Sequence, residues 1–202
     1  MSVIQITVQG RSPYLMHHFG PKAEADVQTP GIRAHRGERG TPREQAEEVV
    51  YRSKNGALYI PGGAMYRAIV DAGKFHKHGR NKLTTGSSSL VPSGLWLDEE
   101  DSIAIPLMLG EKPIVNYEVD GRAVFNAKVG ARIMCFRPRI DKWEATFRLT
   151  VDDSFFTQGQ VRDLVDDAGK KIGIGAFRVE RKGPFGRFEV KKWKVEIAAQ
   201  AA

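Results

Sequence analysis

The chain has 202 residues, of which 41% are hydrophobic, and a formal net charge of +7. These values are typical of a globular domain of ordinary size, and the basic balance favours an anionic partner, most commonly nucleic acid. No apolar run approaches the ~20 residues of a membrane-spanning helix, and the first residues lack the layout of a signal peptide, so we expect a cytoplasmic protein. The single cysteine, Cys135, excludes a disulfide framework and a cysteine zinc site.

The first half of the chain predicts regular elements around one long loop. Residues 3–8 alternate in polarity as a half-buried strand does, whereas residues 9–40 show little apolar periodicity. We expect this loop to be mobile until a partner orders it. Residues 41–44 have the form of a capping box that begins a short helix, and Asn55-Gly56 predicts a hairpin. Residues 64–76 predict a second helix with an apolar face.

The second half predicts mainly strands, and these are residues 90–97, 103–108, 114–125, 131–137, 143–151 and 187–197. The Asp120-Gly121 pair predicts that its strand folds back on itself, and we expect residues 131–137 to pair with residues 143–151. The acidic run at residues 98–101 is expected to be a solvated turn. Residues 158–168 predict a helix that Gly169 ends.

Without its insertions, the chain runs strand, helix, strand, strand, helix, strand. The six core elements are residues 3–8, 64–76, 90–97, 143–151, 158–168 and 187–197. This order predicts an α+β, ferredoxin-like fold (a split βαβ, RRM-like arrangement), in which two helices cover one face of an antiparallel sheet. The other face is then free to bind a ligand, as in RNA-recognition domains. We expect one domain over residues 1–202, with residues 98–140 as an insertion long enough for a projecting β-hairpin.

The most basic part of the chain is also rich in glycine. Residues 170–194 carry nine Lys or Arg residues and two Glu residues. Their net charge of +7 equals that of the whole protein. Glycine permits positive φ and the close approach of another backbone, and the basic side chains suit phosphates. We expect Phe177, Phe185 and Phe188 to offer flat faces to bases. The alternative is a glycine-rich hairpin with a solvated basic face.

Three basic clusters and the glycines between them are predicted to bind RNA. The predicted RNA-binding residues are Arg33, Arg36, Arg39, Arg67, Lys74, Lys77, Arg80, Lys171, Gly173, Gly175, Arg178, Arg181, Lys182, Gly183, Gly186 and Arg187. Binding through phosphates and stacked bases would tolerate many sequences and weaken steeply with salt. For any one of these cations, the alternative is a charge that serves solubility only. We predict no metal site, since His76 and His78 do not share a helix face. We also predict no cofactor, since the third glycine of a dinucleotide-binding fingerprint is misplaced.

Two segments resemble the RAMP superfamily of CRISPR-associated proteins. Residues 58–68 are similar to its strand-to-helix entry, and residues 173–190 are similar to its C-terminal glycine-rich loop and last strand. The stretch from residue 137 to the helix at 158–168 resembles the backbone-subunit branch, whose members polymerise along guide RNA in effector complexes. The resemblance implies a ferredoxin-like core, binding of single-stranded guide RNA, and assembly with copies of itself or with other effector-complex subunits. It also implies a β-hairpin thumb, for which residues 98–140 are the candidate.

Catalysis is the less favoured interpretation. His17 and His18 follow the first strand, and RAMP endoribonucleases that process guide RNA often use histidine as a general acid or base. Asp26 lies in the 9–40 loop, and a loop aspartate cuts the target in RNA-slicing backbone subunits. No second catalytic partner is marked by spacing, so we predict a non-catalytic RNA-binding protein. A metal-independent endoribonuclease and a phage-borne mimic that binds a host effector complex are the alternatives.

Overall fold

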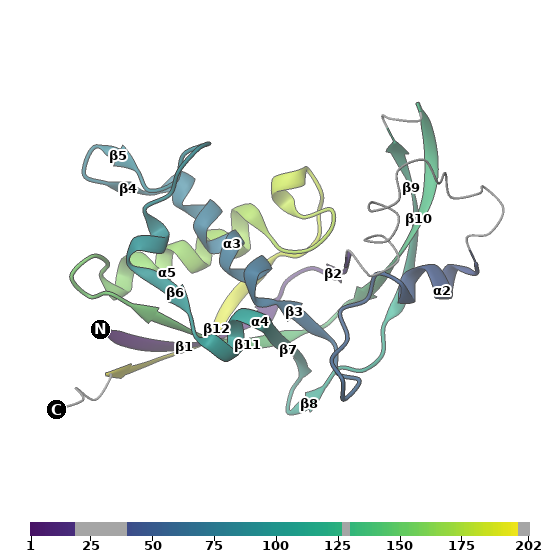
Figure 1. Cartoon of the computed structure of the whole chain (residues 1–202), viewed down its shortest axis with the longest axis horizontal. Helices are drawn as coiled ribbons and strands as arrows, with labels where there is room; N and C mark the ends of the chain where they lie inside the picture. The colour runs from purple at the N-terminus through teal and green to yellow at the C-terminus, as the bar shows by residue number, and fades with distance from the viewer. Residues whose placement is uncertain (19–39, 127–129, 198–202) are drawn as a thin grey trace, which may run out of the picture.

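The computed structural model describes residues 1–18, 40–126 and 130–197 (Figure 1). Its four core strands are β1 (Ser2–Gly10), β6 (Leu95–Leu97), β11 (Glu144–Val151) and β12 (Phe188–Ile197). They lie antiparallel in the order β12-β1-β11-β6. One helix connects β1 to β6 and another connects β11 to β12, which is the split βαβ arrangement. The ferredoxin-like fold predicted from the sequence is therefore confirmed.

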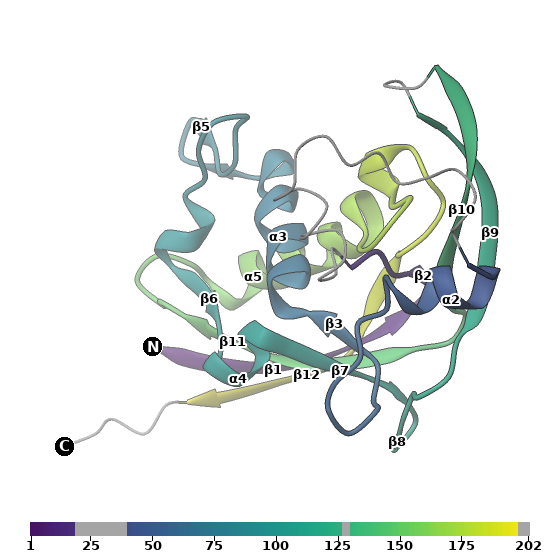
Figure 2. The ribbon, with the colours of Figure 1, turned by 45° about the vertical axis from the view of Figure 1, so that its right-hand side comes forward.

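The two connecting helices, α3 (Gly62–Ala72) and α5 (Gln158–Asp167), cover the same face of the sheet (Figures 1 and 2). Ile4, Ile6 and Val8 of β1 are fully buried and alternate with half-buried residues. They share one hydrophobic core with the apolar residues of both helices. Burial of each such side chain stabilises the fold by about 1.5–3 kcal/mol, so the alternation along β1 fixes which face of the sheet carries the helices.

Short strands extend the sheet beyond its core, namely β3 (Tyr59–Pro61), β7 (Ala104–Leu109) and β8 (Lys112–Pro113). β6 and β7 pair with opposite ends of the same edge of β11, and helix α4 (Glu99–Ile103) joins them. The strand predicted over residues 90–97 forms only over β6, because Val91–Ser93, with its proline, is a 3₁₀ turn.

The prediction of a solvated acidic turn at residues 98–101 is wrong, because this run begins α4. The carboxylate of Asp101 accepts the backbone N–H of Arg148 at 2.7 Å. Burial raises the pKa of this carboxyl above its usual value. The acidic run therefore helps to attach α4 to the sheet.

A long hairpin, β9 (Glu118–Asn126) and β10 (Ala131–Ile140), projects beyond the sheet and is called the thumb hairpin below (Figures 1 and 2). The predicted fold-back at Asp120-Gly121 is wrong, since β9 is one strand in which Gly121 lies opposite Phe136. A Cβ on Gly121 would lie 2.8 Å from the Phe136 ring, so this glycine makes room for a side chain. The predicted pairing of residues 131–137 with 143–151 is also wrong, because β10 pairs with β9 and with β2 (Tyr14–Leu15).

Helix α2 (Pro42–Glu47) begins at the predicted capping box and anchors the thumb hairpin. The Thr41 hydroxyl accepts the Glu44 N–H, and the Glu44 carboxylate accepts the Thr41 N–H. At the other end of the helix, the Tyr117 hydroxyl donates to Glu47 at 2.5 Å. The Arg43 guanidinium lies over the Tyr117 ring at 3.9 Å. These contacts hold the base of the hairpin against the rest of the molecule.

Several turns differ in detail from the sequence predictions. Helix α3 is followed by a 3₁₀ turn (Gly73–Phe75) and a small hairpin, β4 (Lys77–His78) and β5 (Asn81–Lys82). The predicted hairpin at Asn55-Gly56 is a turn flanked by a single bridge between Arg52 and Leu58. No helix in the described parts of the chain is long and apolar enough to cross a membrane.

Helix α5 does not end at Gly169 as predicted. It continues as a π-helical turn (Ala168–Ile172) and stops at Gly173, whose φ is 75°. A Cβ on Gly169 would lie 2.1 Å from the carbonyl oxygen of Phe188, so this glycine allows the turn to pack against β12. The extra turn carries the chain to the start of the glycine-rich stretch.

Candidate nucleic-acid interface

The glycine-rich loop, residues 173–187, folds back on itself between α5 and β12. Gly173, Gly175 and Gly186 have φ values of 75°, 77° and 70°. The Ile174 N–H donates to the Gly186 carbonyl at 3.0 Å, and the Phe185 N–H donates to the Phe177 carbonyl at 3.2 Å. These bonds give the loop a defined shape.

The glycines of this loop are packed against the protein itself. A Cβ would lie 2.4 Å from the Leu15 oxygen at Gly175, 1.7 Å from the Phe177 oxygen at Gly183, and 1.9 Å from the Ile174 oxygen at Gly186. The expected close approach of a backbone therefore occurs, but the backbone belongs to this chain. These contacts fix the backbone that carries the basic side chains of the loop.

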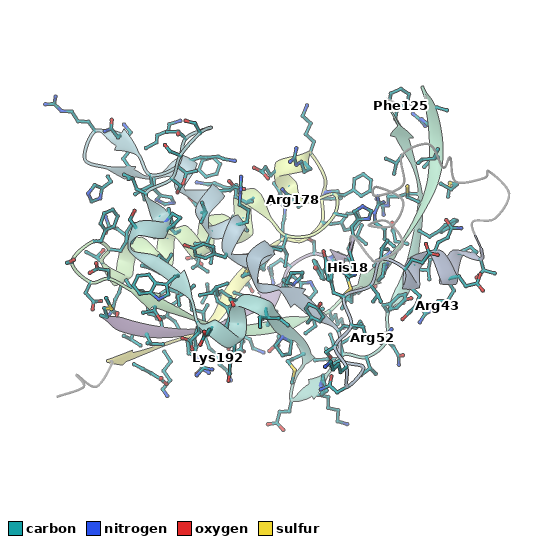
Figure 3. All side chains as sticks on the ribbon, in the orientation of Figure 1. His18, Arg43, Arg52, Phe125, Arg178 and Lys192 are labelled. Atoms are coloured by element: carbon teal, nitrogen blue, oxygen red, sulfur yellow. The ribbon has the colours of Figure 1, made fainter. Side chains whose placement is uncertain are left out.

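A pocket of about 160 Å³ lies between α3 and the glycine-rich loop. Its lining residues are Ala64, Arg67, Ala68, Asp71, Ile172, Gly173, Ile174, Gly175 and Arg178. The fold thus brings Arg67 together with three predicted binding residues that lie more than 100 positions later in the sequence, namely Gly173, Gly175 and Arg178. Figure 3 shows Arg178 on the loop above the sheet, on the side that carries the helices.

Carboxylates at the pocket compensate part of its positive charge. Arg67 pairs with Asp71 at 3.0 Å, and Glu180 pairs with both Lys74, at 2.6 Å, and Arg178, at 2.8 Å. Burial acts to raise the pKa of the Glu180 carboxyl, but the hydrogen bonds from the two cations outweigh it and hold the pKa below its usual value. Glu180 is therefore charged at neutral pH and reduces the attraction of the loop for phosphate.

The other predicted cations lie at several places. Lys77 and Arg80 belong to the region of the β4–β5 hairpin, at the end of α3 away from the thumb hairpin (Figures 1 and 2). Lys171 pairs with Asp167 at 2.7 Å. The remaining ones are exposed on the loop or at its end, namely Arg181, Lys182 and Arg187. Arg33, Arg36, Arg39 and Asp26 lie outside the described residues.

Two arginines that the sequence predictions missed face the glycine-rich loop from the thumb hairpin. The Arg122 guanidinium lies 4.6 Å from the centre of the Phe185 ring and 5.5 Å from that of Phe177. The Arg137 guanidinium lies 5.1 Å from the centre of the Phe177 ring. In the sequence, Arg122 and Arg137 are seen only as one arginine on each of two strands. The register of β9 and β10 is needed to show that both arginines approach the loop.

The phenylalanines of the loop are less available to bases than predicted. Phe188 is 1% exposed and packs edge-on against Trp143 in the core. Phe185 is 9% exposed and lies under Arg122. Only Phe177 is half-buried, and it carries the unusual φ of 50°. Stacking on these rings would require the arginines of the thumb hairpin to move.

The two candidate catalytic histidines follow β2, near the base of the thumb hairpin. The centre of the His18 ring lies 4.7 Å from that of the Tyr51 ring, and the backbone N–H of His18 donates to the Val49 carbonyl. Burial and, after it, the positive charge of Arg137 hold the pKa of the His17 imidazole below its usual value. In the part of the chain that the structure describes, neither ring is hydrogen-bonded to a side chain that could share a proton.

Replacing Arg137 with methionine is expected to raise the pKa of His17 part of the way to the ordinary value of ~6.5. The shift is partial because burial, the larger cause, remains. NMR titration of the imidazole signals measures it, with a His17→Gln variant to assign the resonance. An unchanged pKa in the Arg137 variant would contradict the proximity of the two side chains.

The open face of the sheet, opposite the helices, is polar. Thr7 and Thr146 share a hydrogen bond of 2.9 Å across β1 and β11, and Lys194 pairs with Glu196 at 2.8 Å on β12. Among the described residues of the four core strands on this face, Trp96 is the one aromatic side chain, and it is 37% exposed. The face therefore lacks the two or three stacking rings of an RNA-recognition domain. Figure 3 shows Lys192 on this side, away from Arg178.

No family model and no curated protein matches the chain. Among solved structures, its fold is similar to that of a chain in the cryo-EM structure of the type III-B Cmr-beta bound to cognate target RNA, with a TM-score of 0.54. The two chains are 10% identical, and the match covers 98% of this chain and 61% of that chain. The protein thus spans less than two thirds of the chain that it resembles, and at this identity the likeness shows a shared fold.

Proposed function

We propose that the protein is a RAMP-type subunit that binds single-stranded RNA across the surface formed by α3, the glycine-rich loop and the thumb hairpin. The observation that carries the proposal is the position of the most basic stretch of the chain, residues 170–194. Its loop borders the pocket beside α3 and faces two further arginines of the thumb hairpin. The fold likeness supports the proposal, because the similar chain belongs to a complex solved with target RNA.

In this proposal the bound strand is a guide RNA, and the protein assembles along it with copies of itself or with other subunits of a CRISPR-type effector complex. Cations that meet phosphates carry no sequence information, so binding tolerates many sequences. We infer binding without cleavage, since the described cations offer phosphate contacts and neither His17 nor His18 has a proton-sharing side chain among the described residues.

Salt-titrated binding of single-stranded RNA, single-stranded DNA and duplex RNA tests the function. We expect the protein to prefer single-stranded RNA. The affinity should fall steeply with salt, and the slope of log affinity against log salt concentration should be about −0.7 for each phosphate contact. Equal and feeble retention of all three nucleic acids would contradict the proposal. Cleavage of RNA without added metal would favour an endoribonuclease, and binding to a protein complex alone would favour a mimic.

Replacing Glu180 with glutamine is expected to tighten RNA binding about fivefold. The change removes a carboxylate from the loop and releases Lys74 and Arg178 for phosphates. Because Lys74 is 37% and Arg178 25% exposed, each of the two lost ion pairs should lower the free energy of unfolding by at most about 1 kcal/mol.

The matched control is Glu196→Gln, which removes the same charge from an exposed pair on the open face of the sheet. Fluorescence anisotropy with labelled RNA measures both variants. If Glu196→Gln tightens binding as much as Glu180→Gln, the effect reflects net charge, and the glycine-rich loop is not the binding surface.

A further inference from the structure

The side chain of Arg137, at the base of the thumb hairpin, is buried and only partly hydrogen-bonded. It is 9% exposed, and its Nε and Nη1 atoms have no hydrogen-bond partner among the described residues. Burying an arginine in this way is costly, and unpartnered buried donors are uncommon in native proteins. Such a group calls for an explanation, and a bound anion is one that suits a positively charged donor.

The carboxylate on the opposite strand does not pair with Arg137. Asp120 lies directly opposite it on β9, but both Asp120 oxygens accept hydrogen bonds from Arg122, at 2.5 and 2.6 Å. Asp120 is therefore committed to Arg122, and no ion pair to Arg137 is formed among the described residues. The depressed pKa of His17 reflects the positive charge of Arg137, after the effect of burial.

The position of Arg137 favours RNA as the source of the anion. Its guanidinium lies beside Phe177, where the thumb hairpin faces the glycine-rich loop. Exposed cations of the loop, Arg181 and Lys182, lie a few residues further along the chain. A strand of phosphates suits this surrounding better than an isolated carboxylate of a protein partner.

We propose that Arg137 binds a backbone phosphate of the RNA strand at the base of the thumb hairpin, between the hairpin and the glycine-rich loop. This inference rests on the proposed function and identifies a contact within that surface. Because its two free nitrogens are buried, the phosphate reaches them only when the guanidinium turns outward or Phe177 moves. Phe177 is suited to such a movement, since its φ of 50° is a strained conformation for a residue other than glycine.

The variant Arg137→Met separates a binding residue from a structural one. A residue that stabilises the free protein would lower the melting temperature when replaced. An unpartnered buried charge should do the opposite, and we expect the melting temperature of the free protein to rise by about 3 °C. With a labelled oligouridylate of about 16 nucleotides, the affinity should fall about tenfold and the logarithmic salt slope should become less steep by about 0.7.

Two further variants serve as controls. Arg139→Met removes the same charge two residues along β10, from a side chain that is 36% exposed and paired with Asp141. Because Asp141 already compensates the charge of Arg139, this change should weaken RNA binding less than about threefold, against about tenfold for Arg137→Met. Arg137→Lys keeps the charge. It should have the salt slope of the wild type and an RNA affinity between those of the wild type and Arg137→Met.

The outcomes distinguish the inference from the proposed function. If the wild-type protein does not bind RNA, the proposed function fails and the inference falls with it. If the wild type binds but Arg137→Met binds equally well with the same salt slope, only the inference is overturned. It is also overturned if the variant melts at a lower temperature, or if sedimentation shows that it loses self-association while keeping RNA affinity, which would identify a protein carboxylate as the anion.

Discussion

Replacing Gly186 with alanine is expected to lower the free energy of unfolding by about 3 kcal/mol or more. The new Cβ would lie 1.9 Å from the Ile174 carbonyl oxygen, and Ile174 is 1% exposed in the core. The positive φ of 70° adds its own cost of about 1 kcal/mol for a residue with a side chain. The clash lies where the Ile174 N–H bonds to the Gly186 carbonyl, so the whole loop should loosen and RNA binding should weaken with it.

Urea denaturation of Gly186→Ala and Gly79→Ala isolates the effect of the clash. Gly79 also has a positive φ, of 60°, but a Cβ there would meet nothing within 4 Å. Its replacement should cost only about 1 kcal/mol, the price of the backbone conformation alone. Equal losses in the two variants would show that the glycine-rich loop is not packed against the core in the way described above.

Replacing both Arg178 and Arg187 with alanine is expected to weaken RNA binding at least about 100-fold. Each residue is proposed to meet a phosphate, and a hydrogen bond to a charged group contributes about 1.5–3 kcal/mol. The logarithmic salt slope should become less steep by about 1.4 for the two lost contacts. The fold should persist, because Glu180 keeps its pair with Lys74 when Arg178 is removed.

The control for this double variant is Lys192→Ala with Lys194→Ala, which removes the same charge from the open face of the sheet (Figure 3). We expect a loss of less than about threefold there, since only the long-range field of the protein changes. Similar losses in both double variants would mean that RNA is bound by net charge over the whole surface.

The order of core elements could be predicted because local patterns decide it. The alternation along β1 and the capping box of α2 depend on neighbouring residues, and both formed as the sequence indicates. Turns were harder to predict because some glycines leave room for a neighbouring group and do not mark a turn. Gly121 makes room for Phe136 and Gly169 for the backbone of Phe188, and neither partner is visible from the local sequence.

The candidate site was predictable only in part. The basic glycine-rich loop could be identified from composition, because its charges are close together in the sequence. The pairing of Lys74 with Glu180 joins residues that are 106 positions apart, so the compensation of charge at the pocket could not be foreseen. Arg122 and Arg137 were missed because their approach to the loop depends on the register of β9 and β10.

Photo-crosslinking of bound RNA that carries 4-thiouridine tests the central claim most directly, because it shows both that RNA binds and where. Mass spectrometry of the crosslinked peptides should identify the glycine-rich loop, α3 and the thumb hairpin, with Phe177 among the modified residues. Crosslinks concentrated on the open face of the sheet, around Trp96 and Lys192, would contradict the account and indicate binding in the manner of an RNA-recognition domain.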